Sequence, residues 1–437
     1  MLKRLSLSNI GPASKMEMDL APRLNLITGD NGLGKSFLLD VAWWSLTRHW
    51  PHEVNRNMTS GYMARPRDRE QAATIEFQLT SKTKKDVGYI SKFSPRDDAW
   101  IGKAGRPWNP GLVIYAHADG GFSVWDPARN YWRQKGGVDI QERLPAFVFS
   151  PSEIWDGLNV NIDGKPTLVC NGLISDWASW IKEKGDLARL MAQVLRLLSP
   201  SDNPQDQLQV GGLTRMSVNE ARDIPTLKTA HGVEVPILHA SSGVRRITAL
   251  AYMLLWSWNE HRLAAKLLGE SRANQVIVLV DEIEAHLHPK WQRTILKALL
   301  SLAKSMHSRA TLQLIAATHS PLILASAEPT FDAKQDAWFD LDLETDKTSS
   351  NVYLRHRDFY RHGDVSKWLT SEAFDLKSAR SIEAEIAISA AMNLVNQERP
   401  SRKAVNAVDE QLKMALGDVD RFWVRWSEYK KRLGVDR

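Results

Sequence analysis

Apolar and polar residues follow one another in patterns that change along the chain, and each change predicts a different kind of element. Residues 23–29 form an apolar run that ends in glycine, and residues 35–50 then place apolar side chains three to four positions apart. That order predicts a buried strand, a loop and an amphipathic helix. Two later apolar runs, 275–282 and 312–320, each follow a helical pattern. Strands that alternate with helices form a parallel sheet, so we expect an α/β core.

The remaining patterns divide the chain into further parts. Between residues 51 and 170 the apolar runs are short, alternating and broken by Gly, Pro and Asp, which predicts an antiparallel sheet. Residues 174–198 have the spacing of one extended helix, and two strands are expected around 208–218 and 234–240. After residue 330 we expect one strand pair and a mostly helical tail.

These patterns predict five parts. They are an N-terminal part of the core (1–60), an antiparallel β-rich lobe (61–170), a helical and β insertion (171–234), a C-terminal part of the core (235–330), and a strand pair with a helical tail (331–437).

Composition restricts the class of protein. The 437 residues are 43% hydrophobic, which is enough for a real core. The single cysteine, Cys170, excludes an internal disulfide and leaves too few thiolates for a structural zinc site, so we expect a reducing compartment, the cytoplasm. The start of the chain lacks the apolar core of a signal peptide, and the longest apolar run, 247–258, is too short for a bilayer, so no membrane partner is expected. A net charge of +6 favours a polyanionic partner such as DNA, but only weakly.

Residues 29–36 read GDNGLGKS, which fits the pattern G-x-x-x-x-G-K-[ST] at every fixed position. Glycines allow the backbone to wrap closely, so that several N–H groups and the start of the following helix face phosphate oxygens. Lys35 is predicted to reach the β- and γ-phosphates of ATP, and Ser36 to bind Mg²⁺. An ordinary glycine turn is the alternative, but the strand before the loop and the helix after it favour a nucleotide site. The predicted nucleotide-binding residues of this loop are Gly29, Asp30, Asn31, Gly32, Leu33, Gly34, Lys35, Ser36 and Phe37.

Two strand ends offer further chemistry. The apolar run that starts at residue 275 ends on Asp281 and Glu282. Beside a triphosphate, Asp281 can organise Mg²⁺ and Glu282 can polarise the attacking water, although an isolated acidic pair can also be a solvated strand end. His319 ends the next apolar run, where a neutral imidazole can bind the γ-phosphate, although a lone histidine is more often structural. Glu282, His319 and Lys35 are therefore the predicted catalytic residues.

A second anion site is predicted where Ser242 and Gly243 begin a long apolar helix. Small residues at a helix start bind anions. Because the loop at 29–36 already serves the nucleotide of its own chain, the simplest target is the nucleotide of a partner subunit. A serine cap without a ligand is the alternative. We therefore expect a head-to-head homodimer or a higher oligomer in which Ser242 and Gly243 contact ATP.

The glycine loop, the serine-glycine helix start, the acidic strand end and the histidine strand end follow one another along the chain. In this order they resemble the motifs of the ABC-type ATPases of the SMC, RecF and OLD group. The segments DEIEAHLHPKWQ and ATHSP are similar in particular to stand-alone AAA-type ATPases of OLD and Septu-like bacterial defence systems. The resemblance covers roughly residues 1–60 and 235–330. It implies an α/β fold, an ABC-type P-loop ATPase head with a mixed sheet, in which two heads sandwich two ATP molecules and hydrolysis releases the clamp.

The chain departs from that group in three places. Its signature reads SSGVR instead of the transporter sequence LSGGQ, which argues against a membrane transporter. A glutamine that senses Mg²⁺ is not obvious between 60 and 170, since Gln141 precedes its strand, and the loop 149–157 is the other candidate for that place. The helix at 174–198 is too short for the coiled coil of an SMC arm.

Asp340 and Asp342 raise the alternative of a second, nuclease activity, because they share one face of a predicted strand as a metal pair would. OLD nucleases carry an Asp-x-Asp pair after the ATPase, but here no glycine-flanked glutamate precedes it. A solvated strand face is therefore favoured over an integral nuclease.

The end of the tail combines aromatic and basic residues at helical spacing. Bases could stack on the rings, but an amphipathic helix that packs its aromatic face on the head or a partner is the more common case. The charged segments 64–70 and 82–86 are interpreted as loop charges, with a DNA groove as the alternative. The residues of the tail in question are Trp423, Trp426 and Tyr429, with Arg421, Arg425, Lys430, Lys431 and Arg432.

Together these observations predict a cytoplasmic, Mg²⁺-dependent ATPase whose ATP-sandwiched heads control a separately encoded effector or a DNA transaction, in phage defence or genome maintenance. The alternative is a sensor or scaffold for DNA or a partner protein that clamps with ATP and turns over very slowly. The rate of phosphate release, with and without DNA, separates the two.

Overall fold

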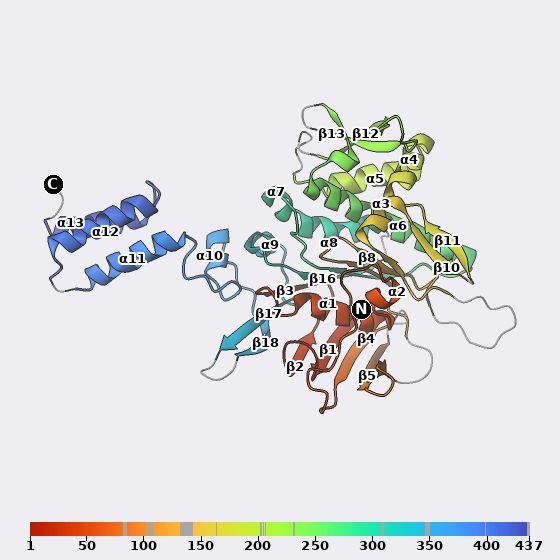
Figure 1. Cartoon of the computed structure of the whole chain (residues 1–437), viewed down its shortest axis with the longest axis horizontal. Helices are drawn as coiled ribbons and strands as arrows, with labels where there is room; N and C mark the ends of the chain where they lie inside the picture. The colour runs from red at the N-terminus through yellow and green to blue at the C-terminus, as the bar shows by residue number, and fades with distance from the viewer. Residues whose placement is uncertain are drawn as a thin grey trace. The chain divides into compact units, whose positions relative to one another are not determined.

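The computed structural model describes the chain except for residues 82–84, 103–107, 132–142, 163, 202, 204, 206, 230–231, 307–309, 346–349, 398 and 435–437, and describes only the backbone of 303–306. The chain forms two compact units, Met1–Gly363 and Asp364–Arg437 (Figure 1). The division expected near residue 330 therefore lies later along the chain, because the strand pair after that residue belongs to the sheet of the first unit.

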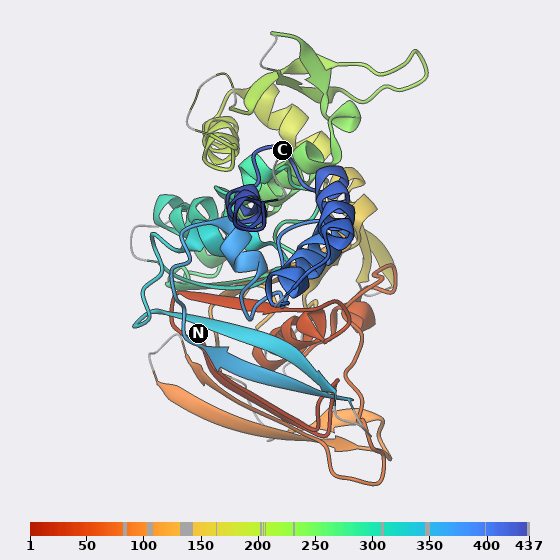
Figure 2. The same ribbon diagram turned by 90° about the vertical axis from the view of Figure 1, so that its left-hand side faces the viewer.

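An eight-stranded sheet forms the centre of the first unit, in the order β18-β17-β3-β16-β15-β7-β8-β9. The five strands from β17 to β7 run parallel, and β18, β8 and β9 extend the sheet by antiparallel pairing. Figure 2 shows β17 and β18 beside the red strand β3. The strands are β3 (Leu24–Gly29), β7 (Leu112–Ala116), β8 (Phe122–Trp125), β9 (Phe147–Phe149), β15 (Gln275–Val280), β16 (Thr311–Ala317), β17 (Asp336–Thr345) and β18 (Ser350–Arg357).

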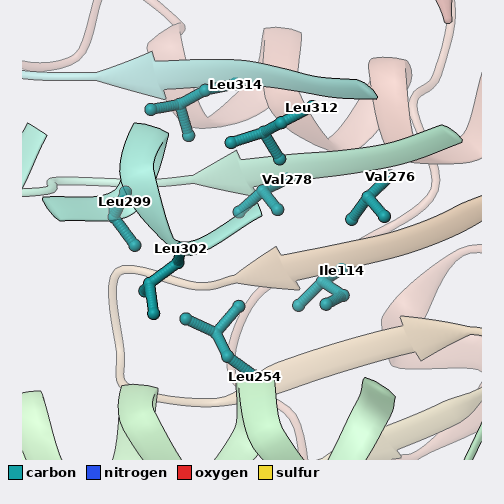
Figure 3. Close-up of a pocket in the computed structure, with 8 residues that line it drawn as sticks. All are labelled: Ile114, Leu254, Val276, Val278, Leu299, Leu302, Leu312 and Leu314. Atoms are coloured by element: carbon teal, nitrogen blue, oxygen red, sulfur yellow. The ribbon is translucent and has the colours of Figure 1, made fainter. Parts of the chain in front are cut away.

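Helices cover both faces of this sheet, which explains the continuous apolar runs of its parallel strands. On one face, Val113 and Ile277 pack in the core that includes the buried side chains of α1 (Lys35–Thr47). On the other face, α6 (Ser242–Leu267) and α8 (Ile295–Met306) lie over the even-numbered positions. A small cavity of about 20 Å³ remains between those helices and the sheet (Figure 3). Its lining residues are Ile114, Leu254, Val276, Val278, Leu299, Leu302, Leu312 and Leu314.

A second sheet of five antiparallel strands packs on the other side of α1, in the order β2-β1-β4-β5-β6 (Figure 1). The expectation of a single antiparallel sheet for residues 51–170 is therefore wrong. The strands of this range divide between two sheets and a separate hairpin. Strand β4 is buried at alternate positions, whereas β7 is buried at every position, as a central strand must be. The additional strands are β1 (Leu2–Ser8), β2 (Lys15–Asp19), β4 (Thr74–Thr80), β5 (Asp86–Ser94), β6 (Ala99–Ile101), β10 (Leu158–Ile162) and β11 (Lys165–Cys170).

The insertion contains two helices where the sequence predicted one. Helix α4 (Leu173–Glu183) ends at Lys184, which is left-handed with φ 53°, and α5 (Asp186–Leu197) starts anew after Gly185. A non-glycine residue with positive φ interrupts the helix even though the apolar spacing continues across it. Three short strands follow, β12 (Gln209–Thr214), β13 (Ile224–Lys228) and β14 (Glu234–Pro236).

The second unit is helical, with its own apolar core. Trp426 is fully buried in that core and donates a hydrogen bond from Nε1 to Asp409 (2.8 Å). The hydroxyl of Tyr429 donates to the carbonyl of Leu394 (2.7 Å). The aromatic face of the last helix thus packs within its own unit, so Trp426 is not available to stack on bases. The helices are α10 (Val365–Leu369), α11 (Ile382–Val395), α12 (Arg402–Ala415) and α13 (Phe422–Arg432).

Among the described residues, no helix combines the length and the apolar character that a membrane crossing requires. The apolar run 247–258 lies in α6, where nearly every side chain is buried against the rest of the first unit.

Candidate functional site

The loop between β3 and α1 has the backbone shape that its glycines allow. Gly29 and Gly34 have φ of 130° and 102°, which side chains rarely permit. A Cβ atom at Gly29 would lie 2.5 Å from the carbonyl oxygen of Leu341, and one at Gly34 would lie 2.7 Å from Cγ of Pro12. Both glycines are therefore required by packing as well as by backbone conformation.

Helix α1 starts at Lys35 directly after this loop. Its first backbone hydrogen bond runs from Leu38 N to the carbonyl of Gly34 (3.0 Å), and no side chain caps its start. The N–H groups before Leu38 have no partner within the helix, and the positive end of the helix dipole faces the loop. This arrangement fits an anion of several oxygens, such as a polyphosphate.

Lys35 is buried, and its ammonium group lies inside the curve of the loop. It donates hydrogen bonds to the carbonyls of Gly29 (2.7 Å) and Asp30 (2.8 Å). Burial lowers the pKa of Lys35, and the nearby charges of Asp281 and Glu282 act in the opposite direction. The ammonium therefore contacts the loop and lies near enough to the two acids that end β15 to feel their charges.

Asp281 is 3% exposed, and one of its carboxylate oxygens, Oδ1, is buried without a hydrogen-bond partner among the described residues. Burial raises the pKa of Asp281, while a hydrogen bond from Ser36 lowers it. A buried carboxylate oxygen without a donor, beside a hydroxyl and facing a polyphosphate loop, fits a Mg²⁺ ligand set that phosphate oxygens complete. No group of three or more His, Cys, Asp or Glu side chains in the described part of the chain could hold a metal alone.

Glu282 and His319 both lie close enough to Lys35 for their electrostatic interactions with it to matter. Glu282 follows Asp281 in a left-handed conformation with φ 47°, a strained backbone for glutamate that turns the chain sharply at the end of β15. His319 is half-buried, and burial and the charge of Lys35 lower the pKa of its imidazole, although a hydrogen bond to the backbone of Gly29 raises it. The lowered pKa favours the neutral form of the imidazole. The structure thus brings Lys35, Asp281, Glu282 and His319 into one cluster beside the loop, and their catalytic roles stay a prediction.

The sequence interpretation missed Glu284. Its carboxylate accepts hydrogen bonds from the hydroxyl of Thr318 (2.7 Å) and from the backbone N–H of His319. The available signal was a third acid two positions after Glu282, which by itself is typical of any exposed turn.

Ser242 and Gly243 lie elsewhere in the same chain. Ser241 caps α6 by accepting a hydrogen bond from Val244 N (3.5 Å), and Ser242 is exposed. A Cβ atom at Gly243 would lie 2.7 Å from the carbonyl oxygen of His286, so the helix start lies against the turn after Glu282. In the described part of the chain, no hydrogen bond joins residues 241–243 to the loop 29–36. The contact of Ser242 with a nucleotide stays a prediction.

A guanidinium group joins α6 to the strand ends. Arg246 donates hydrogen bonds to the carbonyls of His117 (3.0 Å), Ala118 (3.2 Å) and Asp281 (3.4 Å). The first turn of α6 is therefore fixed to the ends of both β7 and β15. At this edge Tyr115 also donates a hydrogen bond to Asp40 (3.0 Å), and burial raises the pKa of Asp40 to about 8.

The predicted place of a Mg²⁺-sensing glutamine stays unassigned. Gln141 lies outside the described residues. The loop 149–157 forms the end of β9 and α3 (Pro151–Asp156), where Ser150 and Glu153 cap the helix. Glu153 also accepts hydrogen bonds from Asn55 (2.6 Å) and Asn57 (2.9 Å), which gives that loop a structural role.

Asp340 and Asp342 do not form the solvated strand face that the sequence favoured. Asp340 is 1% exposed and accepts a hydrogen bond from the Thr28 hydroxyl (2.5 Å). The guanidinium of Arg357 binds Asp342 (2.5 Å) and Asp340 (3.4 Å). The difference arises because β17 pairs with β3, which places Asp340 beside the strand that leads into the loop. An arginine already occupies the space between the two acids, which does not favour a metal pair.

Several known proteins are similar to parts of this chain in sequence or structure. The family AAA_21, described as "AAA domain, putative AbiEii toxin, Type IV TA system", matches residues 24–325. "Retron Vc95 probable ATPase" of Vibrio cholerae serotype O1 biovar El Tor is 31% identical over 27% of this chain and 21% of its own length. "Septu protein PtuA" of Bacillus thuringiensis is 20% identical over 75% of this chain and 73% of its own length. The SMC head domain from Thermotoga maritima, at 12% identity, covers 80% of this chain and 97% of its own with a TM-score of 0.37.

The family match includes the loop at Gly29, the start of α6, the acids that end β15 and His319. The alignment covers only about a fifth of the retron ATPase, so the activity of that whole protein is not transferred. The resemblance to ABC-type ATPases of bacterial defence systems is confirmed, as is the fold class of a mixed-sheet ATPase head with an antiparallel lobe, a helical insertion and a helical tail. The chain belongs to the AAA_21 family of AAA-domain ATPases.

Proposed function

We propose that this protein binds ATP with Mg²⁺ and hydrolyses it to ADP and phosphate. The observation that carries the proposal is the convergence of Lys35, Asp281, Glu282 and His319 around Gly29, at the start of a helix that has no acidic residue in its first turn. Residues 29–37 bind the phosphates through backbone N–H groups, and Lys35 exchanges its bonds to two carbonyls for bonds to phosphate oxygens.

Ser36 and Asp281 would hold Mg²⁺, because the hydroxyl lies beside the carboxylate and Oδ1 of Asp281 lacks a protein donor. When bound, the ion neutralises charge that develops on the phosphate oxygens.

Glu282 is the general base of the proposal. It accepts a proton from the water that attacks the γ-phosphorus, while the bond to the ADP oxygen breaks. The imidazole of His319 is neutral and donates a hydrogen bond toward the γ-phosphate. Lys35 stabilises negative charge on the same oxygens.

A second copy of the chain completes the site. Ser242 is exposed at the start of a 26-residue helix, and no hydrogen bond among the described residues joins it to the phosphate loop of its own chain. In a head-to-head homodimer, Ser242 and Gly243 would reach the ATP of the partner subunit. Arg246 binds the carbonyls at the end of β15, so this helix start is fixed to the hydrolytic site of its own chain.

The proposed output is control of a separately encoded effector protein, or of a DNA transaction, in phage defence or genome maintenance. Similarity to a retron ATPase and to a Septu protein favours defence. The net charge of +6 favours DNA as a further partner, and no membrane partner is proposed.

The direct test compares Glu282→Gln with the wild type. The variant should bind ATP normally and lose hydrolysis by a factor of about 100 or more, because only activation of water is removed. It should also accumulate as an ATP-dependent dimer in size-exclusion chromatography. A Glu282→Gln protein that releases phosphate at the wild-type rate would remove Glu282 from the mechanism, and negligible wild-type turnover with and without DNA would support the slow sensor instead.

The contact across the dimer has its own test. Ser242→Arg should bind ATP but fail to dimerise with it, because the long side chain fills the space for the partner's phosphates. Ser389→Arg is the matched control, since Ser389 is an exposed serine on a helix of the second unit. Unchanged ATP-dependent dimerisation of Ser242→Arg would contradict the shared site.

A further inference from the structure

Glu284 connects the strand end that carries Glu282 to the segment that carries His319. Its Oε2 accepts a hydrogen bond from the Thr318 hydroxyl (2.7 Å), and its Oε1 accepts one from the backbone N–H of His319. Thr318 is fully buried. One carboxylate thus holds two successive residues of the segment, directly at the position from which the imidazole projects.

Further hydrogen bonds connect the segment after β16, which contains His319, to the turn after β15. Ser320 N donates to the Thr318 hydroxyl (3.0 Å), and the Ser320 hydroxyl donates to Oε1 of Gln292 (2.7 Å). Gln292 Nε2 donates in turn to the carbonyl of Leu287 (2.9 Å). The turn after β15 and the segment after β16 are therefore joined at two separate points, with His319 between them.

The surroundings of Glu284 differ from those of Glu282. Both oxygens of Glu284 already accept hydrogen bonds from protein donors. Among the described residues, no protein donor is bonded to the Glu282 carboxylate. A carboxylate with two fixed donors orients those donors, whereas a carboxylate without them can accept a proton from water.

We propose that Glu284 is the positioning residue for His319. It fixes the Thr318 hydroxyl and the backbone N–H of His319, so that the imidazole is held beside Gly29 and Lys35, where the γ-phosphate would lie. This inference rests on the ATPase function proposed above and adds a residue to it. Glu284 acts through geometry and not through its charge.

The choice of variants follows from that distinction. Glu284→Ala removes both hydrogen bonds. Glu284→Gln retains both, because its amide oxygen can accept from His319 N–H and its amide nitrogen can donate to the oxygen of the Thr318 hydroxyl. Glu284→Ala should therefore lower kcat about 10- to 100-fold with little change in ATP affinity, as expected for a displaced catalytic group, and Glu284→Gln should restore most of the rate.

A double variant tests whether Glu284 acts through the histidine. If it does, Glu284→Ala in a His319→Ala background should cause no further loss of kcat. A multiplicative loss would overturn the proposal, and so would a Glu284→Gln protein as inactive as Glu282→Gln. Thermal unfolding of each variant identifies any loss of rate that comes from loss of fold.

Hydrogen exchange measures the hydrogen bond between His319 N–H and Glu284 without requiring ATP hydrolysis. The amide of His319 should exchange faster in Glu284→Ala than in the wild type and in Glu284→Gln, because its acceptor is removed. Equal exchange in all three proteins would overturn the proposal. A wild type that binds ATP but never hydrolyses it would remove the proposed function, and the exchange result would still decide the role of Glu284.

Discussion

Thr28 is the last residue before the phosphate loop, and its hydroxyl connects two side chains of β17. It accepts a hydrogen bond from Trp338 Nε1 (2.7 Å) and donates one to Oδ1 of Asp340 (2.5 Å). All three side chains are fully buried. Thr28→Val keeps the shape of the side chain and removes both bonds, so it isolates the contribution of the hydroxyl.

The magnitude follows from the number of groups affected. Each lost hydrogen bond costs about 1 kcal/mol net, and a buried polar group that loses its partner adds about 1–3 kcal/mol. Asp340 keeps its contact with Arg357 (3.4 Å), which limits its share. We therefore expect Thr28→Val to lower the free energy of unfolding by about 3 kcal/mol. For a unit that ends at Gly363, that is a fall in Tm of about 4 °C.

The assay is thermal and urea unfolding, with ATP affinity measured on the same samples. Thr248→Val is the matched control. Thr248 is also fully buried, but its hydroxyl only donates to the carbonyl of Val244 (2.8 Å), one turn earlier in α6. Its loss should cost less than about 1 kcal/mol, because that carbonyl also lies within the hydrogen-bonding pattern of the helix.

The comparison of Thr28→Val with Thr248→Val tests the contribution of the Thr28 hydroxyl to stability. Equal Tm values for Thr28→Val and Thr248→Val would refute the view that the Thr28 hydroxyl stabilises the link between β3 and β17. If the view is right, ATP affinity should also fall a few-fold in Thr28→Val alone, because the loop that follows Thr28 loses its support.

Three further predictions concern other parts of the first unit. Lys35→Ala should lower ATP affinity about 10- to 100-fold in a fluorescent-nucleotide titration, since hydrogen bonds from charged groups contribute about 1.5–3 kcal/mol; unchanged affinity would exclude Lys35 from phosphate binding. Burial raises the pKa of Asp340 from 3.8 to about 6, so the folded chain holds a proton that the unfolded chain has lost, and stability falls as the pH rises between those values. Asp340→Asn should remove this dependence in urea unfolding at several pH values, and the same slope in both proteins would show that Asp340 is not its source. Val278→Ile should raise Tm by about 1 °C by filling the cavity beneath the sheet, whereas Val280→Ile, on the same strand but outside the cavity lining, should not.

The residues of the candidate site were predictable because their signals are local. Gly29, Gly34 and Lys35 belong to one turn whose backbone conformation dictates the residue types, and the acids and His319 each end an apolar run that the sequence displays directly. These features need no knowledge of which strands pair.

The features that were missed depend on distant partners. The sequence favours a solvated strand face for Asp340 because no glycine-flanked glutamate precedes it, yet pairing of β17 with β3 buries it against Thr28. Strand β7 joined the central sheet through β15, which lies more than 150 residues later in the chain. Local periodicity does not specify such pairings, and a left-handed residue such as Lys184 leaves no trace in the apolar spacing.

The two hydrogen bonds from Lys35 to the carbonyls of Gly29 and Asp30 have a consequence for the thermodynamics of binding. The lysine holds the loop in its curved form through these two protein acceptors, so the conformational entropy of the loop is lost during folding and not during association. In the proposed function, ATP binding is an exchange, in which the ammonium gives up two neutral acceptors for charged ones. The measured affinity reports only the difference between the two sets of bonds.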